Sequence, residues 1–85
     1  ADVRAAILGC LRELPYAVGV TGLVAILRGS PNTPASAARL AQFGACADTS
    51  RTLLNRAVQA LLDEGALERY MKDQYPMLRI ADAGG

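Results

Sequence analysis

Residues 48–80, DTSRTLLNRAVQALLDEGALERYMKDQYPMLRI, change from a helical pattern to a strand pattern within a single segment. Before Gly65, apolar side chains recur at the 3.6-residue period of a helix. The apolar stripe consists of Leu53, Leu54, Ala57, Val58, Leu61 and Leu62. The polar side consists of Arg51, Thr52, Asn55, Arg56 and Gln59. With candidate N-caps at Asp48, Thr49 and Ser50 and a stop at Gly65, we predict a long amphipathic helix.

After Gly65 the hydrophobic period changes from 3.6 to 2, which is the period of a strand. Residues 67–71 and 77–80 are short strand candidates, and residues 72–76 form a turn-rich connection. We therefore predict a β-hairpin at the C-terminal end of the chain.

Two further helices are predicted in the first third of the chain. Residues 3–14 carry apolar side chains at helical spacing, and Asp2 is a suitable N-cap. A short apolar face follows, for which Thr21 is the expected N-cap and Gly29 the expected stop.

A third helix is predicted to start at Thr33-Pro34, because a capping residue followed by proline is typical of a helix start. It should run for about two turns through Leu40 to Phe43 and end at Gly44. Helices followed by a terminal hairpin predict an α+β, mostly helical fold, namely a winged helix, which is a helix-turn-helix with a short β-hairpin wing. Residues 1–85 should form this single domain.

Size and composition set the limits of the interpretation. A chain of 85 residues has room for one core, and 52% hydrophobic residues are enough to fill it. The apolar runs fall short of the roughly 20 residues that a bilayer span requires, and no signal-peptide pattern opens the chain. Because it begins at Ala1 without methionine, we expect a piece excised from a larger protein.

The net charge of +1 does not by itself indicate a strongly basic surface. Nearly all the cations are arginine, however, and the planar guanidinium suits phosphate and guanine recognition. A high arginine content reflects genome composition equally well. The distribution of these residues therefore matters more than their sum.

The sequence gives little support for enzyme activity. The chain has no histidine, and Cys10 and Cys46 lack zinc-site spacing, so we expect two buried free thiols. No Walker A motif is present, and Asp63 and Glu64 are most simply a solvated pair. We expect no catalytic residue, metal or cofactor in this domain.

The sequence VGVTGLVAILRGS at residues 18–30 resembles the RQC domain of RecQ helicases, which has an aromatic-Gly-x-Gly stretch, Leu or Ile, and then Arg-Gly-Ser or Arg-Gly-Ala. The resemblance continues through an aromatic-Gly pair in residues 40–44 and a hydrophobic pattern in residues 54–67, and covers nearly the whole chain.

The resemblance implies a non-catalytic accessory domain of an ATP-dependent DNA helicase that acts in DNA repair, recombination and replication. ATP, Mg and Zn would then belong to other parts of the parent helicase. The implied location is the bacterial cytoplasm, in association with the nucleoid. The implied partners are duplex or forked DNA, other domains of the same helicase and repair proteins, but no membrane.

The first implied DNA contact is the loop containing Arg28, Gly29, Ser30 and Asn32, which matches a phosphate-gripping loop of the family. An arginine fork, a hydroxyl and free backbone N–H groups together suit a phosphate, and glycine lets the backbone approach closely. The alternative is that Gly29 merely ends a helix and Arg28 is solvated.

The second implied contact is the N-terminal end of the long helix, around Thr49, Ser50 and Arg51, where unpaired N–H groups favour an anion. The simpler interpretation is that Thr49 and Ser50 only cap the helix. In an ordinary helix-turn-helix, Arg51, Asn55 and Arg56 would read bases in the major groove. Because the family mostly grips the DNA backbone, we expect structure-selective binding instead.

The third implied contact is the hairpin, which in this family acts as a wedge between paired and unpaired strands. Tyr75 is the first candidate for the wedge, Tyr70 is the second, and Lys72 is placed among the DNA contacts. An aromatic ring at the tip stacks on the terminal base pair. The alternative is that each tyrosine packs on its neighbouring strand.

Three departures from the family pattern predict a lower affinity for DNA. Cys46 replaces the second glycine of the family motif, Ala47 replaces a phosphate-contacting cation, and Val18 replaces an aromatic residue. Two other functions remain open for a winged helix. One is a sequence-specific transcription regulator, and the other is a protein-interaction module.

Overall fold

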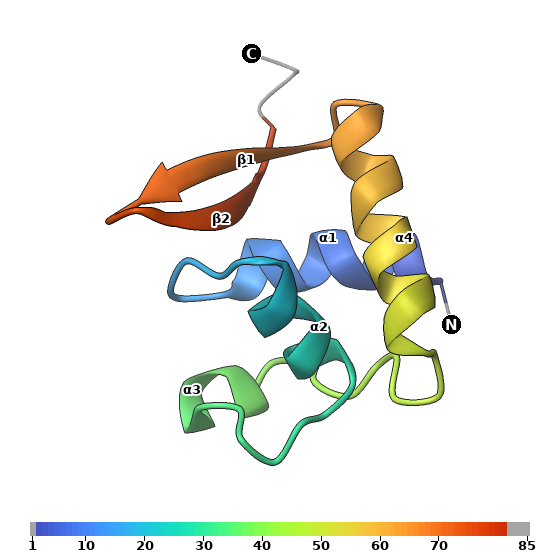
Figure 1. The fold of residues 1–85 in the computed structure, drawn as a ribbon. Helices are drawn as coiled ribbons and strands as arrows, with labels where there is room; N and C mark the ends of the chain where they lie inside the picture. The colour runs from blue at the N-terminus through green and yellow to red at the C-terminus, as the bar shows by residue number, and fades with distance from the viewer. Residues whose placement is uncertain (1, 82–85) are drawn as a thin grey trace.

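The computed structural model describes residues 2–81, in which helices come first and a two-stranded antiparallel hairpin comes last (Figure 1). The elements are α1 (Val3–Glu13), α2 (Val20–Leu27), α3 (Ala35–Ala38), α4 (Arg51–Asp63), β1 (Leu67–Lys72) and β2 (Tyr75–Ile80). The predicted order of elements and the α+β, mostly helical class are confirmed.

The core lies between α1, α2 and α4 and is covered at one end by the hairpin (Figure 1). Its largest fully buried side chains are Ile7, Leu23, Ile26, Leu27, Leu54, Leu61 and Leu67. Burying each of these contributes about 1.5–3 kcal/mol to folding. Across residues 2–81, no helix has both the length and the apolar character that crossing a bilayer requires.

The ends of α1 and α4 follow the predicted capping chemistry. The Asp2 carboxylate accepts a hydrogen bond from the Ala5 N–H at 3.3 Å, and the Ser50 hydroxyl accepts one from the Leu53 N–H at 3.2 Å. After α4, Gly65 adopts a φ of 85°, which is the left-handed conformation that suits a helix stop. Local sequence therefore sets the bounds of both helices.

The predicted start of α2 is wrong by two residues. Gly19 rather than Thr21 occupies the N-cap position, and no side chain caps the helix. Thr21 instead lies within the first turn and is exposed. The first N–H groups of α2 are consequently left without a side-chain acceptor.

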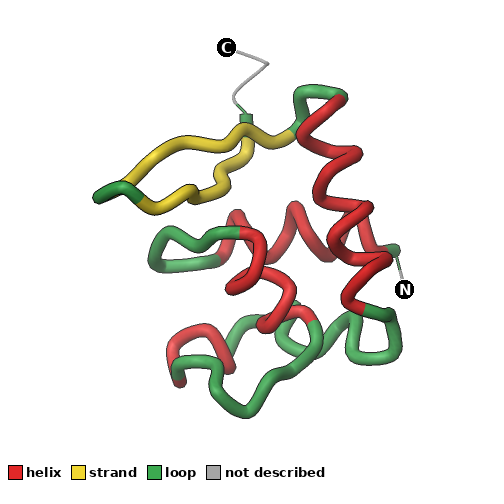
Figure 2. Tube along the Cα trace, in the orientation of Figure 1, coloured by secondary structure: helices red, strands yellow, loops and turns green. Residues whose placement is uncertain are grey.

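The third helix is shorter than predicted, because α3 contains only four residues. The chain after it runs through successive turns, seen as the green segment between α3 and α4 in Figure 2. Within that segment the N–H of Gly44 donates to the Ile26 carbonyl at 2.9 Å, and the N–H of Cys46 donates to the Leu27 carbonyl at 2.8 Å. These bonds satisfy carbonyl groups at the end of α2. The segment that donates them forms turns, so α3 does not continue into it.

Two details of residues 48–80 also differ from the prediction. The apolar stripe of α4 is narrower than expected, because Leu53 is 55% exposed. The strands extend into the region predicted as a turn, so the connection contains only Asp73 and Gln74. Both residues have positive φ, 51° and 71°, as a tight two-residue hairpin turn requires.

The hairpin is attached to the segment that precedes α2. The Leu78 N–H donates to the Val18 carbonyl at 2.8 Å, which forms a short antiparallel bridge. Beside it, Gly19 lies so close to β2 that an added Cβ would be 2.7 Å from the Pro76 carbonyl oxygen. This contact fixes the wing relative to α2.

Candidate nucleic-acid interface

Three shallow depressions meet on the exposed side of α2. Thr21 and Gly22 line the first, Gly22 and Ala25 line the second, and Thr21 and Ala25 line the third. Because these residues are small, the exposed surface of α2 is recessed between the elements around it. We call the surface formed by Thr21, Gly22 and Ala25, with the three depressions around it, the α2 face.

The first depression lies between the start of α2 and the hairpin and has a volume of about 430 Å³. The hairpin contributes Arg69, Tyr75 and Pro76. Tyr75 is the first residue of β2, next to the two-residue turn, and is 66% exposed. The structure therefore places the first wedge candidate at the tip of the wing and on the α2 face.

The second depression lies between the end of α2 and the loop after it, with a volume of about 240 Å³. Ser30 and Asn32 line it on one side, and Tyr16 lines it on the other. The predicted loop therefore contributes these two polar side chains to the α2 face. Tyr16, which follows α1, was not predicted as a site residue.

The loop does not supply the free backbone N–H groups that were expected. The Gly29 N–H donates to the Ile26 carbonyl at 3.0 Å, and the Ser30 N–H donates to the Ala25 carbonyl at 2.9 Å. The Asn32 N–H donates to the Ser30 hydroxyl at 3.3 Å. The first two are the bonds of a Schellman helix end, and the third is a local bond to a side chain, so the loop has only side chains left to hold an anion.

Arg28 and Gly29 do not line the α2 face. Arg28 is exposed but lines none of the three depressions. Gly29 has a φ of 73°, and a Cβ added to it would lie 3.3 Å from the Gly44 Cα. The close approach at Gly29 is therefore to another segment of the protein, which gives this glycine a structural role.

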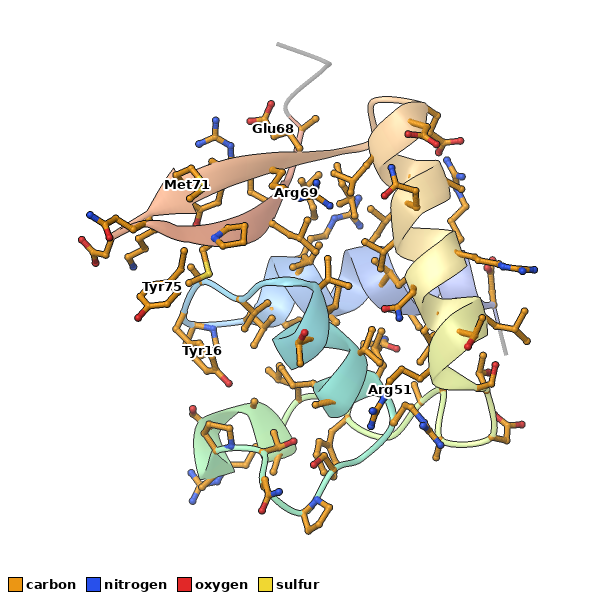
Figure 3. The ribbon with its side chains drawn as sticks, viewed as in Figure 1. Tyr16, Arg51, Glu68, Arg69, Met71 and Tyr75 are labelled. Carbon is orange, nitrogen blue, oxygen red and sulfur yellow. The ribbon has the colours of Figure 1, made fainter. Side chains whose placement is uncertain are left out.

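The third depression lies between α2 and the start of α4 and has a volume of about 210 Å³. Arg51 and Asn55, one helical turn apart, line its α4 side. Figure 3 shows Arg51 between the two helices. Arg56 is exposed but lines none of the depressions, because the next position along the helix points to another side.

The N-terminal end of α4 presents backbone donors beside Arg51. Ser50 is the N-cap, whereas the Thr49 N–H is used in a bond to the Cys46 carbonyl at 2.9 Å. Within residues 2–81, the N–H groups of Arg51 and Thr52 have no hydrogen-bond acceptor. Two free N–H groups and a guanidinium thus lie together at the positive end of a helix.

The two other predicted wing residues, Tyr70 and Lys72, do not line the α2 face. Tyr70 is half-buried, and the Arg79 guanidinium carbon lies 4.9 Å from its ring centroid, so the second wedge candidate packs within the hairpin. Lys72 is paired across the hairpin with Tyr75 but lines a different depression together with Tyr16. Figure 3 shows Tyr16 and Tyr75 at the same end of the molecule.

The charged residues that line the α2 face are all cations. Arg51 and Arg69 line it, and neither forms an ion pair among the described residues. Of residues 2–81, no aspartate or glutamate lines its three depressions. A net charge of +1 is therefore compatible with a locally positive α2 face.

The two cysteines have no place in this surface. Both are free and buried, as predicted, and burial raises the pKa of Cys10 to about 11 and also raises the pKa of Cys46. Between residues 2 and 81, no group of three or more histidine, cysteine, aspartate or glutamate side chains could hold a metal ion.

Comparison with known proteins identifies the family. A search of curated proteins found no match. The family model of the RQC domain matches residues 2–85, which is nearly the whole chain. The helices, the terminal hairpin and this match together place the chain in the RQC family, the DNA-binding winged-helix domain typical of RecQ helicases.

Proposed function

We propose that this domain grips duplex DNA by its backbone at the junction between paired and unpaired strands, and that it assists strand separation by a parent ATP-dependent helicase. The observation that carries the proposal is the α2 face itself. Five segments around α2 contribute polar or aromatic side chains to it: the segment after α1, β1, β2, the loop after α2, and the start of α4.

The start of α4 would hold one phosphate. The two free N–H groups and the Arg51 guanidinium provide charge-assisted donors at the positive end of a helix. Asn55 adds an amide one turn further along. Ser30 and Asn32 would hold a second backbone position through their side chains. Such contacts position DNA without reading its sequence.

The wing would act at the end of the duplex. Tyr75 is exposed next to the turn, so its ring is free to stack on a terminal base pair. Tyr70, held beneath Arg79, would support the hairpin. Arg69 lines the same depression as Tyr75 and was not predicted from the sequence, and we add it to the proposed DNA contacts.

The first experiment compares the affinity of the domain for a blunt duplex, a fork of the same sequence and duplexes selected from a random pool. Backbone gripping predicts similar affinity for unrelated duplexes and tighter binding to the fork. Tight binding confined to one sequence would instead indicate a transcription regulator. No DNA binding even at low salt, where a few phosphate contacts are measurable, would indicate a protein-interaction module.

The second experiment compares Arg51→Ala with Arg39→Ala, because Arg39 is also exposed but lies outside the α2 face. Arg51→Ala should weaken binding to all duplexes alike and reduce the slope of log affinity against log salt by about 0.9. Arg39→Ala should leave that slope unchanged. Equal slopes for Arg51→Ala and the unmodified domain would contradict the phosphate assignment.

The third experiment tests the wedge in the parent helicase. Tyr75→Ala should preserve duplex affinity and slow unwinding, because stacking on the terminal pair is lost while the backbone contacts remain. Tyr75→Phe keeps the ring and should unwind normally. Normal unwinding by Tyr75→Ala would exclude this role.

A further inference from the structure

A fourth depression of about 450 Å³ lies between the end of α1 and the hairpin, and we call it the wing groove. Its polar lining residues are Tyr16, Tyr70, Lys72 and Arg79. Its apolar lining residues include Leu11, Leu14, Leu78 and Ile80. Only Leu78 also lines the depression between α2 and the hairpin, so the wing groove is a separate surface.

The charged side chains that line the wing groove are all positive. Lys72 and Arg79 are its charged lining residues, and no acidic side chain lines it. Glu68 pairs with Arg79 but is not part of the lining. Because a surface ion pair of this kind is weak, it leaves the guanidinium able to contact an anion.

The wing groove also contains aromatic side chains, on which the bases of a single strand can stack. Tyr16 is 38% exposed, and Tyr70 is held in place by the Arg79 guanidinium. Proteins that bind unpaired nucleic acid combine a positive groove for the backbone with aromatic rings on which bases stack. The wing groove contains both features within one depression.

Tyr16 connects this groove to the α2 face. It lines the wing groove together with Lys72, and it also lines the depression formed by Ser30 and Asn32. The two depressions therefore adjoin at Tyr16, so the wing groove is next to the proposed duplex site.

We propose that the wing groove binds an unpaired DNA strand leaving the junction, with Tyr16 and Tyr70 stacking on bases and Lys72 and Arg79 contacting phosphates. This inference rests on the proposed function, because it assigns a path to one of the separated strands. It adds Tyr16, Tyr70 and Arg79 to the residues that contact DNA.

The test measures the affinity of the domain for a blunt duplex and for the same duplex with an oligo-dT tail on one strand or the other. One tail should tighten binding by roughly tenfold, as expected for stacking of a base or two. Tyr16→Leu should remove most of this gain, measured as the ratio between the affinities of the variant itself for the tailed and the blunt duplex. Tyr16→Phe should keep the gain, because it keeps the ring.

Arg79→Gln has a matched control in Arg4→Gln, because both arginines form a surface ion pair with a glutamate and both changes remove one charge. Arg79→Gln should reduce the tail contribution and lower its salt slope by about 0.7, the value for one phosphate contact with a single strand. Arg4→Gln should change neither. Thermal melting of both variants checks that the fold is retained.

The outcomes separate this inference from the proposed function. If the duplex binds normally but neither tail adds affinity, or if Tyr16→Leu keeps the full gain, this inference is wrong and the proposed function stands. If neither duplex nor tail binds, the proposed function itself is wrong. If the tails add nothing while an acidic peptide binds in an Arg79-dependent way, the groove serves a protein partner and the inference is overturned.

Discussion

Replacing Gly19 with alanine tests how the wing is held against α2. The backbone of Gly19 has φ of −91° and ψ of −172°, a conformation that any residue adopts. The glycine is therefore required for space rather than for backbone freedom. A Cβ at this position would lie 2.7 Å from the Pro76 carbonyl oxygen, whereas ordinary contacts begin at 3.4 Å.

The loss of stability caused by Gly19→Ala depends on the groups that must move. Relieving the overlap requires β2 to shift by on the order of 0.5 Å, because the atom in contact is backbone rather than a flexible side chain. The Leu78 to Val18 hydrogen bond, at 2.8 Å, lies within two residues of the contact on both strands. Overpacking of this kind costs about 1–3 kcal/mol, and weakening the hydrogen bond adds to the cost.

Gly22→Ala, inside α2, provides the control. A Cβ at Gly22 would lie 3.5 Å from the Val18 Cβ, which is an ordinary contact. Since alanine favours a helix interior over glycine, this change should stabilise the domain by about 0.5–1 kcal/mol. Two glycine-to-alanine changes three residues apart should thus have effects of opposite sign.

Urea and thermal unfolding, followed by circular dichroism, measure both effects. For a domain of this size each kcal/mol corresponds to roughly 4–8 °C in Tm, so Gly19→Ala should lower Tm by at least about 4 °C. A Tm for Gly19→Ala equal to or above that of the unmodified domain would show that the space at Gly19 is not required. So would an equal loss in Gly22→Ala.

Three further predictions concern stability. Leu54→Ala should cost about 2–5 kcal/mol because Leu54 is fully buried, whereas Leu53→Ala should cost under about 0.5 kcal/mol, and urea unfolding of both measures the difference. Gln74→Gly should raise Tm, since glycine adopts the φ of 71° without the penalty of about 1 kcal/mol that a side chain incurs; an unchanged or lower Tm would argue against that strain. Burial raises the pKa of the Cys10 thiol from its ordinary 9.0 to about 11, so its contribution to stability is full below pH 9 and is lost as pH rises through 11. The free energy of unfolding at pH 8 and pH 11 should show this loss, and Cys10→Ala should lack it; equal pH dependence in both proteins would contradict the assignment.

Elements defined by local pattern were predictable from the sequence. The amphipathic repeat and the capping residues of α1 and α4 act within a few residues of one another, and the structure places the Asp2 and Ser50 caps as expected. The change of period at Gly65 likewise predicted the hairpin. The predicted strands were too short, because the pairing of Lys72 with Tyr75 depends on a two-residue turn that no glycine marks.

The candidate site was predictable only in part. Arg51, Asn55, Ser30, Asn32 and Tyr75 do line one surface, although they come from distant segments. Arg28 and Arg56 do not line the depressions, because their positions place them beyond the edges of α2 and α4 that face each other. Arg69 and Tyr16 were missed because an isolated cation in a strand and an isolated tyrosine after a proline carry no local signal of a site.

Local sequence patterns were enough to predict the positions of the helices, the starts of α1 and α4, the terminal hairpin and the family resemblance. How far α3 extends was not predictable in this way, because the segment after α3 forms bonds from Gly44 and Cys46 to the end of α2. Only the tertiary structure decided which polar side chains share a surface. Periodicity and capping act over one or two helical turns, whereas a shared surface depends on packing between elements that are far apart in the chain.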